Sequence, residues 1–360
     1  MRALLLLIFT LRLSAAEWTA DTERPIQTAS LPKPALIYLP ENWSADRAWP
    51  AIFFYPGTGG QANVARMREH TGGRDFIIVG MPPRDDGAFT YTPEIVPLEQ
   101  RSLHEVRDRL AAEVRLDPKR VFVAGFSKGG WLSALLLAHE PGLAGGCVLG
   151  GGWSHHQHEP PLKFRGTVYI YVGDGRLDGN FPPSLRASRE FKQLGARVTL
   201  DVWPQTAHAL PVGGSEGLRQ WLALIARGAS VHDDAARWAE PEFARITAMA
   251  NPIQQWDELR RFSTRPFTRA LGEEWSRRVE TKLSELLSQP AVAAEAALDR
   301  ELTAIHLREI QDLRTTTLEA VAPKYQALAA RAPDSPTGKL ARHDAERIRQ
   351  LWKTVPADGK

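Results

Sequence analysis

Residues 121–130 read Val-Phe-Val-Ala-Gly-Phe-Ser-Lys-Gly-Gly, an apolar run that leads into a G-x-S-x-G motif. The run predicts a buried strand, and a helical pattern follows it. Glycine at positions 125 and 129 leaves room for a tight strand-to-helix turn. Such a turn places Ser127 at the amino end of a helix, where backbone N–H groups can stabilise an anion. The stretch predicts a nucleophilic serine; the alternative is a purely structural Gly/Ser turn.

A serine hydroxyl needs a base to act as a nucleophile, and the base needs an orienting acid. We expect His208 to be the base, because it lies on the loop after the last predicted strand, residues 198–202. Asp174 and Asp178 both follow the predicted strand 168–172 and are expected on the loop after it. We favour Asp178 as the acid because it lies further from the strand and can turn toward a histidine. Asp174 is the alternative acid, and the other aspartate would form a turn.

Two backbone N–H groups are expected to bind the oxyanion that forms during acyl transfer. One is the N–H of Lys128, directly after the nucleophile. The second should come from the Gly-rich segment 55–60, Tyr-Pro-Gly-Thr-Gly-Gly, where Thr58 is the first choice and Gly59 the alternative. The segment lacks the G-K-[ST] ending of a P-loop, so a phosphate cradle is not expected.

Together, the segments around Gly57, Ser127 and His208 resemble the α/β-hydrolase superfamily. Within it, they are most similar to the secreted esterases grouped with polyhydroxybutyrate depolymerases and feruloyl or acetylxylan esterases. The resemblance covers about residues 30–228. It implies hydrolysis of carboxylic esters by a Ser–His–Asp triad, without a metal or a cofactor. The chain departs from this group in having Pro56 where His is usual, in lacking its cysteine pairs and in carrying a further C-terminal region.

Short apolar runs alternate with helical patterns up to residue 230, which predicts a mostly parallel sheet flanked by helices. The predicted strands are residues 35–39, 51–55, 76–80, 121–124, 146–149, 168–172 and 198–202. The predicted helices are residues 100–115, 129–138, 183–194 and 216–226. The predicted fold class is therefore an α/β-hydrolase fold followed by a C-terminal all-helical region.

The composition changes near residue 230, where we place a domain boundary between 17–230 and 231–360. The second segment contains only three of the 28 glycines, Gly272, Gly338 and Gly359. Apolar residues at helical spacing predict three helices there. These stripes lie within residues 267–283, 298–313 and 340–351. We expect a small antiparallel bundle, packed on itself or on the sheet, that could dock a protein partner.

The first 16 residues have the layout of a secretory signal peptide. A positive start at Arg2 is followed by an apolar run over residues 3–11 and small residues at 14–16. The run is too short to span a membrane. We expect cleavage after Ala16 and a secreted or periplasmic protein without a membrane span. Because Arg12 interrupts the segment late, an uncleaved membrane anchor is the alternative.

Composition narrows the possible partners. A net charge of +3, with no basic run, gives no reason to expect nucleic-acid binding. Cys147 is the only cysteine, so an intramolecular disulfide or a cysteine-built zinc site is excluded. His155, His156 and His158 are interpreted as loop or pocket residues rather than metal ligands.

The predicted substrate is a small-molecule or polymer-linked ester. Two alternatives remain open. One is an α/β-hydrolase peptidase. The other is a catalytically weak hydrolase domain that serves as a docking scaffold through its helical region.

Overall fold

The computed structural model describes residues 18–84, 95–152, 163–164, 168–309 and 315–354. The predicted signal peptide and the histidines at 155, 156 and 158 lie outside the described residues. Among the described helices, none combines the length and the apolar composition needed to cross a membrane.

The described part of the chain contains an eight-stranded sheet in the order β1-β2-β4-β3-β5-β6-β7-β8. The strands are β1 (Thr22–Ile26), β2 (Ala35–Leu39), β3 (Trp49–Tyr55), β4 (Ile77–Gly80), β5 (Leu116–Phe126), β6 (Gly145–Leu149), β7 (Tyr169–Gly175) and β8 (Arg197–Trp203). β2 pairs antiparallel with β1 and β4, whereas all pairs among the strands β3 to β8 are parallel. This arrangement confirms the predicted fold class.

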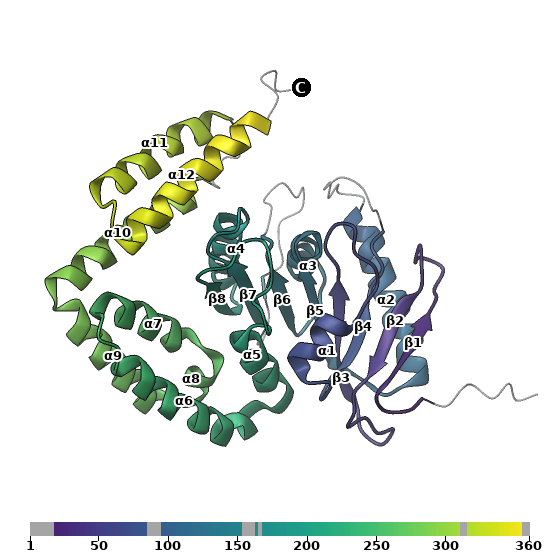
Figure 1. Cartoon of the computed structure of the whole chain (residues 1–360). Coiled ribbons are helices and arrows are strands. Elements are labelled where there is room, and N and C mark those ends of the chain that lie inside the picture. Colours follow the sequence, from purple (N-terminus) through teal and green to yellow (C-terminus); the bar gives the residue numbers. More distant parts are fainter. Residues whose placement is uncertain (1–17, 85–94, 153–162, 165–167, 310–314, 355–360) are drawn as a thin grey trace, which may run out of the picture.

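Helices cover both faces of the sheet (Figure 1). The helices of this part are α1 (Ala65–Thr71), α2 (Ile95–Glu113), α3 (Lys128–His139), α4 (Phe181–Gln193) and α5 (Glu216–Arg227). One face packs against α2, α3 and α4 through an apolar core, and the other face packs against α1 and α5. The continuous apolar strands are thus buried on both sides, as parallel strands usually are.

All predicted strands and helices of this part overlap an element of the structure, but β1 and α1 were not predicted. β1 is an edge strand whose first four residues alternate between half-buried and exposed, so it lacks an apolar run. A second difference concerns Asp174, which was expected on a loop. β7 extends to Gly175, and Asp174 pairs with Val202 of β8 inside the sheet. Its buried carboxyl is satisfied by hydrogen bonds, so the polar residue does not end the strand.

A short 3₁₀ helix, η1 (Gly228–Val231), connects α5 to the C-terminal helices. These are α6 (His232–Thr247), α7 (Pro252–Thr264), α8 (Pro266–Ala270), α9 (Glu273–Leu287), α10 (Pro290–Glu309), α11 (Thr315–Arg331) and α12 (Pro336–Thr354). The helical region is therefore confirmed, whereas a domain boundary near residue 230 stays a prediction.

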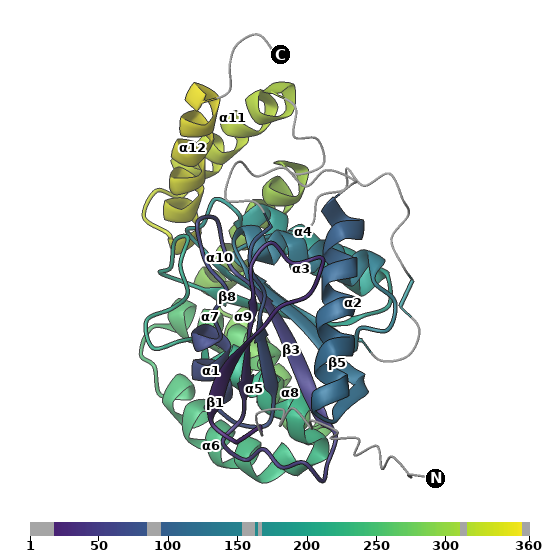
Figure 2. The ribbon, with the colours of Figure 1, turned by 90° about the vertical axis from the view of Figure 1, so that its right-hand side faces the viewer.

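The C-terminal helices form two apolar clusters rather than one bundle. α6 to α9 share a cluster with the first turns of α10, and the end of α10 shares another with α11 and α12. The predicted stripe 267–283 also proves to be two helices, because Gly272 adopts a φ of 81° between α8 and α9. α11 and α12 lie above α4 in Figure 1, and Figure 2 again shows them at that end of the molecule.

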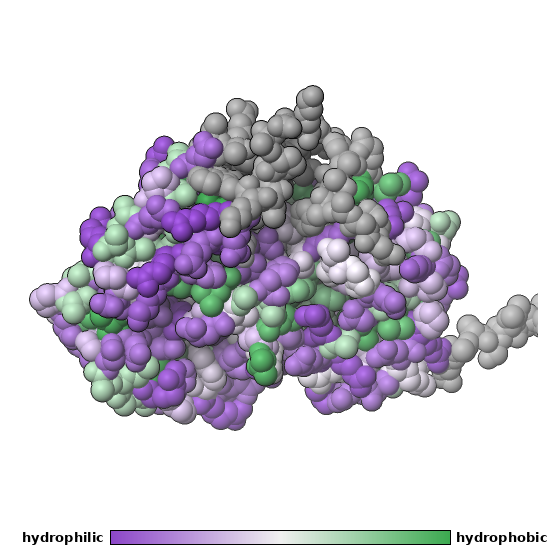
Figure 3. Space-filling model, turned by 45° about the horizontal axis from the view of Figure 1, so that its top comes forward, coloured by the Kyte–Doolittle hydropathy of each residue, from purple (hydrophilic) through white to green (hydrophobic). Residues whose placement is uncertain are grey.

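The surface of the described residues is mostly hydrophilic on the face that Figure 3 shows, with apolar residues scattered in small groups. The large apolar side chains of the C-terminal region are mainly used inside its two clusters. The first of these clusters also packs against α5 of the sheet part, through Ala223 and Leu224.

Candidate active site

Ser127 occupies the sharp turn between β5 and α3. Its backbone has φ 55° and ψ −120°, a conformation that non-glycine residues rarely adopt. A Cβ at Gly125 would lie 2.1 Å from the carbonyl oxygen of Gly129, and one at Gly129 would lie 2.0 Å from that of Tyr55. Only glycine fits at these two positions, which explains the G-x-S-x-G spacing. The turn presents the serine at the end of the strand.

The structure brings Ser127, His208 and Asp178 together from three separate loops. The Ser127 hydroxyl lies 2.8 Å from Nε2 of His208, to which it can donate a hydrogen bond. Nδ1–H of His208 donates to Asp178 Oδ2 at 2.6 Å. The carboxylate is buried, whereas 43% of the histidine side chain is exposed. The serine can therefore transfer a proton to a histidine that a buried carboxylate orients.

The surroundings of Asp178 and His208 shift the pKa of both side chains. Burial alone would raise the pKa of Asp178, but hydrogen bonds from His208, Asp174 and the N–H of Asn180 lower it below the usual value. The hydrogen bond to Asp178 raises the pKa of His208, and partial burial opposes this only in part. At neutral pH, Asp178 is ionised and His208 is a stronger base than an ordinary histidine.

Asp174 does not contact His208 in this arrangement but lies behind Asp178. It is fully buried and accepts hydrogen bonds from the N–H of Gly175 at 2.7 Å and the hydroxyl of Ser184 at 2.6 Å. Burial and the neighbouring charge of Asp178 raise the pKa of Asp174 well above its usual value. Asp174 therefore takes up a proton more readily than Asp178, whose pKa its carboxyl group helps to lower.

Two further neighbours of the site were not predicted from the sequence. The Phe126 ring lies 5.2 Å from the His208 ring, centroid to centroid, and limits where the imidazole can move. Asn180 donates its N–H to Asp178 Oδ1 at 2.9 Å and its side-chain amide to the carbonyl of Gly150 at 3.0 Å. Both lie within three residues of a predicted triad member, so proximity in sequence was the available signal.

The candidate oxyanion donors lie around the nucleophile. Lys128 is the first residue of α3. A Cβ at Gly57 would be 3.3 Å from Cβ of Ser127, so the turn that carries Thr58 and Gly59 lies directly against the serine. The N–H of Gly60 is already bonded to the Gly57 carbonyl at 3.0 Å. The roles of Thr58, Gly59 and Lys128 remain proposals.

Within the residues that the structure describes, there is no group of three or more His, Cys, Asp or Glu side chains suited to hold a metal ion. Cys147 is buried in β6, where burial raises the pKa of its thiol. A buried thiol of this kind is a poor nucleophile.

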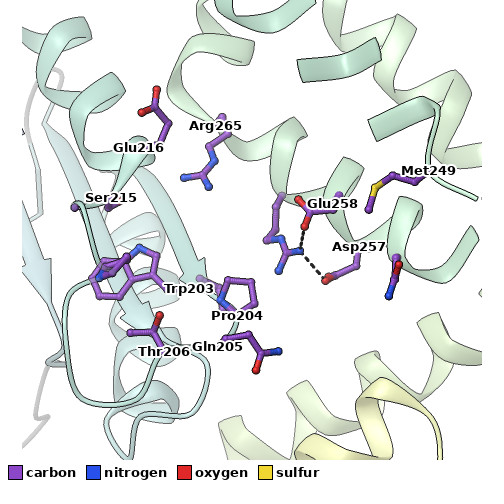
Figure 4. A pocket seen from close by; sticks show the side chains of 15 residues that line it. Trp203, Pro204, Gln205, Thr206, Ser215, Glu216, Met249, Asp257, Glu258 and Arg265 are labelled. Carbon is purple, nitrogen blue, oxygen red and sulfur yellow. Dashed lines mark hydrogen bonds and ion pairs between the residues drawn. The ribbon is translucent and has the colours of Figure 1, made fainter. Parts of the chain in front are cut away.

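A cavity of about 690 Å³ lies behind the loop that carries His208, between this loop and the C-terminal helices. Figure 4 shows Trp203 and Pro204 on one side and Met249, Asp257 and Glu258 on the other. Ser127 is not among its lining residues. Three of the charges there are paired within the wall, because Arg261 of α7 binds both Asp257 and Glu258.

No family model matches the chain, and no curated protein matches its sequence. A carboxylesterase of Bacillus cereus is 19% identical with a TM-score of 0.44, over 53% of this chain and 93% of the other. An acylaminoacyl peptidase of Pyrococcus horikoshii is 14% identical with a TM-score of 0.44. The match covers 58% of this chain and 41% of the peptidase. Esterase 2 of Thermogutta terrifontis, phosphorylated by paraoxon, is 19% identical with a TM-score of 0.41. The match covers 53% of this chain and 85% of the esterase.

Proposed function

We propose that this chain is a serine hydrolase that cleaves carboxylic esters. The observation that supports this most directly is the continuous contact from Ser127 through His208 to Asp178, at 2.8 and 2.6 Å. The strained turn at Ser127 and the raised pKa of His208 agree with it, because a catalytic nucleophile needs an exposed position and a competent base.

In the first half of the reaction, Ser127 Oγ attacks the ester carbonyl while His208 Nε2 accepts the hydroxyl proton. Asp178 stabilises the imidazolium that forms and keeps Nδ1 protonated. The N–H groups of Lys128 and Thr58, or alternatively Gly59, bind the oxyanion of the tetrahedral intermediate. His208 then returns the proton to the leaving alcohol, and an acyl-enzyme remains.

In the second half, a water molecule gives a proton to His208 as it attacks the acyl-enzyme. A second tetrahedral intermediate collapses, the acid leaves, and Ser127 regains its proton from His208. No step requires a metal or a cofactor.

We propose an exported enzyme, secreted or periplasmic, that acts on a small-molecule or polymer-linked ester. The N-terminal sequence pattern and the resemblance to secreted esterases support this proposal. The same triad could also cleave an amide, since His208 can protonate a leaving amine. A substrate panel must therefore include a peptide.

The test compares wild type and Ser127→Ala on short-acyl, long-acyl and feruloyl esters and on a peptide anilide. Without the nucleophile, only binding and oxyanion stabilisation remain, so turnover should fall by about 10³-fold or more. The exposed Ser276→Ala on α9 is the matched control and should retain wild-type activity. Faster cleavage of the peptide than of every ester would favour a peptidase. More than a tenth of wild-type turnover in Ser127→Ala would overturn the mechanism.

A further inference from the structure

The segment between β7 and α4, residues 176–180, carries Asp178 and is called the acid loop here. One side of the acid loop is bonded to the segment that leads to His208. The N–H of Arg176 donates to the carbonyl of Trp203 at 2.8 Å, and the N–H of Leu177 donates to that of Thr206 at 2.9 Å. The loops of the acid and the base are thus connected directly.

The other side of the acid loop contacts α12, more than 160 residues further along the chain. Nε2–H of His343 donates to the carbonyl oxygen of Leu177 at 3.2 Å. The guanidinium group of Arg176 lies 3.4 and 3.5 Å from Asp344 Oδ2. α12 therefore contacts both the backbone and a side chain of this loop.

The contact at Arg176 belongs to a cluster of buried polar side chains, called the junction cluster. Its members are Arg176, His306, Glu309, Tyr325, Asp344 and Arg347, and each side chain is at most 9% exposed. His306 donates to Asp344 at 2.8 Å. Arg347 binds Glu309 through two bonds of 2.8 and 2.7 Å, and Tyr325 donates to the same carboxylate at 2.7 Å.

Few arrangements of these six side chains keep every buried charge paired. A buried charge that loses its partner is strongly destabilising, so Arg176 and Asp344 must stay together in the folded chain. Arg176 points to α12, whereas Asp178, two residues further on, points to His208. A fixed position of Arg176 therefore restricts where Asp178 can lie.

We propose that α12 is a positioning element for the triad acid, in which Asp344 and His343 hold the acid loop so that Asp178 stays against His208. The C-terminal helices thereby contribute to catalysis without touching the substrate. This inference rests on the proposed function and adds positioning residues to it.

The test uses the full-length chain with Asp344→Asn and His343→Ala. A small displacement of a catalytic group can cost up to about 100-fold in rate. We expect Asp344→Asn to lower kcat about tenfold and His343→Ala about threefold, with KM changed less than kcat. The imidazole pKa of His208, measured by NMR, should fall toward the usual value in both variants, because a looser Asp178 stabilises the imidazolium less. His343→Gln keeps a donor and should restore kcat.

Glu309→Gln is the matched control. It also neutralises a buried carboxylate of the junction cluster, but Glu309 does not contact the acid loop among the described contacts. We expect it to lower stability while kcat and the His208 pKa of the folded protein stay at wild-type values. A loss of kcat equal to that of Asp344→Asn would mean that any change in the junction cluster lowers activity, with or without a contact to the acid loop, and would overturn the proposal.

Wild-type kcat and wild-type His208 pKa in folded His343→Ala and Asp344→Asn would also overturn it. If Asp344→Asn does not fold, His343→Ala decides, because its half-buried side chain carries no part of the cluster. A wild-type chain that cleaves none of the substrates overturns the proposed function alone, since the His208 pKa measurements still decide whether α12 positions Asp178.

Discussion

Among the described residues, two histidine–aspartate pairs are joined by a hydrogen bond, one on each side of the acid loop. His208 donates to Asp178 at 2.6 Å, and His306 donates to Asp344 at 2.8 Å. The two contacts have nearly the same length and the same chemistry. Their surroundings differ in almost every other respect.

The His208 ring keeps its second nitrogen for Ser127 and is 43% exposed, whereas the His306 side chain is 1% exposed. His306 packs against the rings of Phe181 and Tyr325, at 5.4 and 5.6 Å between centroids. Burial lowers the pKa of His306 despite the nearby Asp344, but the hydrogen bond to Asp178 raises the pKa of His208. One histidine is therefore suited to exchange protons, and the other remains neutral at physiological pH.

The two carboxylates differ in the same way. Burial would raise the pKa of Asp344, yet His306, Arg176 and Arg347 together hold it far below the usual value. Asp178 has no arginine partner among the described contacts and serves one histidine. The two pairs therefore differ in whether the second ring nitrogen of the histidine reaches a hydroxyl group and solvent.

The largest difference between the two pairs should appear when each histidine is replaced by alanine. We expect His208→Ala to reduce ester hydrolysis about 10⁵-fold or more, as for the base of a comparable triad. Its stability should change little, because the side chain is half-exposed. His306→Ala should instead lower the free energy of unfolding by about 2–4 kcal/mol, since it removes a buried, bonded ring.

Both variants are measured on one ester and by urea denaturation. Turnover per folded molecule in His306→Ala should fall tenfold at most, through its contact with Asp344. Equal loss of activity in folded samples of the two variants would remove the distinction between the pairs.

Replacing the acid gives the next largest effect. Asp178→Asn should cost about 10⁴-fold in kcat, because an amide favours the wrong imidazole tautomer. Asp174→Asn should cost less than tenfold, because burial and the charge of Asp178 favour the uncharged form of Asp174, and Asn has its shape. Steady-state kinetics of both variants decide between them. If Asp174→Asn is the inactive variant, the acid has been assigned to the wrong aspartate.

The pH dependence of activity should follow His208 alone. The base must be neutral to accept the serine proton, so kcat/KM should fall about tenfold per pH unit below its pKa. Because Asp178 raises this pKa, the acid limb should be centred above the value of about 6.5 for an ordinary histidine. A flat profile between about pH 5 and 8 would contradict His208 as the base.

The smallest expected effect is on the pH dependence of the free energy of unfolding, to which His208 and His306 contribute with opposite signs. His306 has a lowered pKa when folded, so the unfolded chain binds more protons below about pH 6.5 and stability falls on acidification. His208 has a raised pKa when folded, so its contribution is complete at low pH and is lost as pH rises through that pKa. A pKa that differs by 1 between the folded and the unfolded chain changes the free energy of unfolding by about 1.4 kcal/mol.

The measurement compares urea unfolding of wild type, His306→Phe and Ser276→Ala at pH 5.5 and 7.5. The loss of stability on acidification should be smaller in His306→Phe than in the other two chains. The same loss in all three would mean that His306 does not resist protonation.

The sequence predicted the α/β architecture and a serine turn because both depend on local patterns. Apolar runs identify buried strands, and the glycines at 125 and 129 are required by contacts within a few residues. The order of Ser127, Asp178 and His208 along the chain agrees with the contacts of the structure. The end of β7 was misplaced because an aspartate usually ends a strand, whereas the Asp174 carboxyl is buried and accepts two hydrogen bonds.

The junction cluster could not be predicted in the same way. The contact between Arg176 and Asp344 depends on how the C-terminal helices return to α4, and no local pattern encodes this. A signal was present in α10, where His306 and Glu309 are buried beside Ile305. Polar residues on the buried side of a helix indicate a partner, but they do not identify it.

The backbone conformation of Ser127 has a consequence for how this chain can evolve. A positive φ at a serine costs of order 1–3 kcal/mol, and glycine would adopt it almost without strain. A lineage under selection for stability alone would therefore accumulate glycine at position 127. If descendants keep serine at this position, selection acts on the chemistry of Ser127. Loss of Ser127 would be one of the first changes expected in a gene copy that is retained for another function.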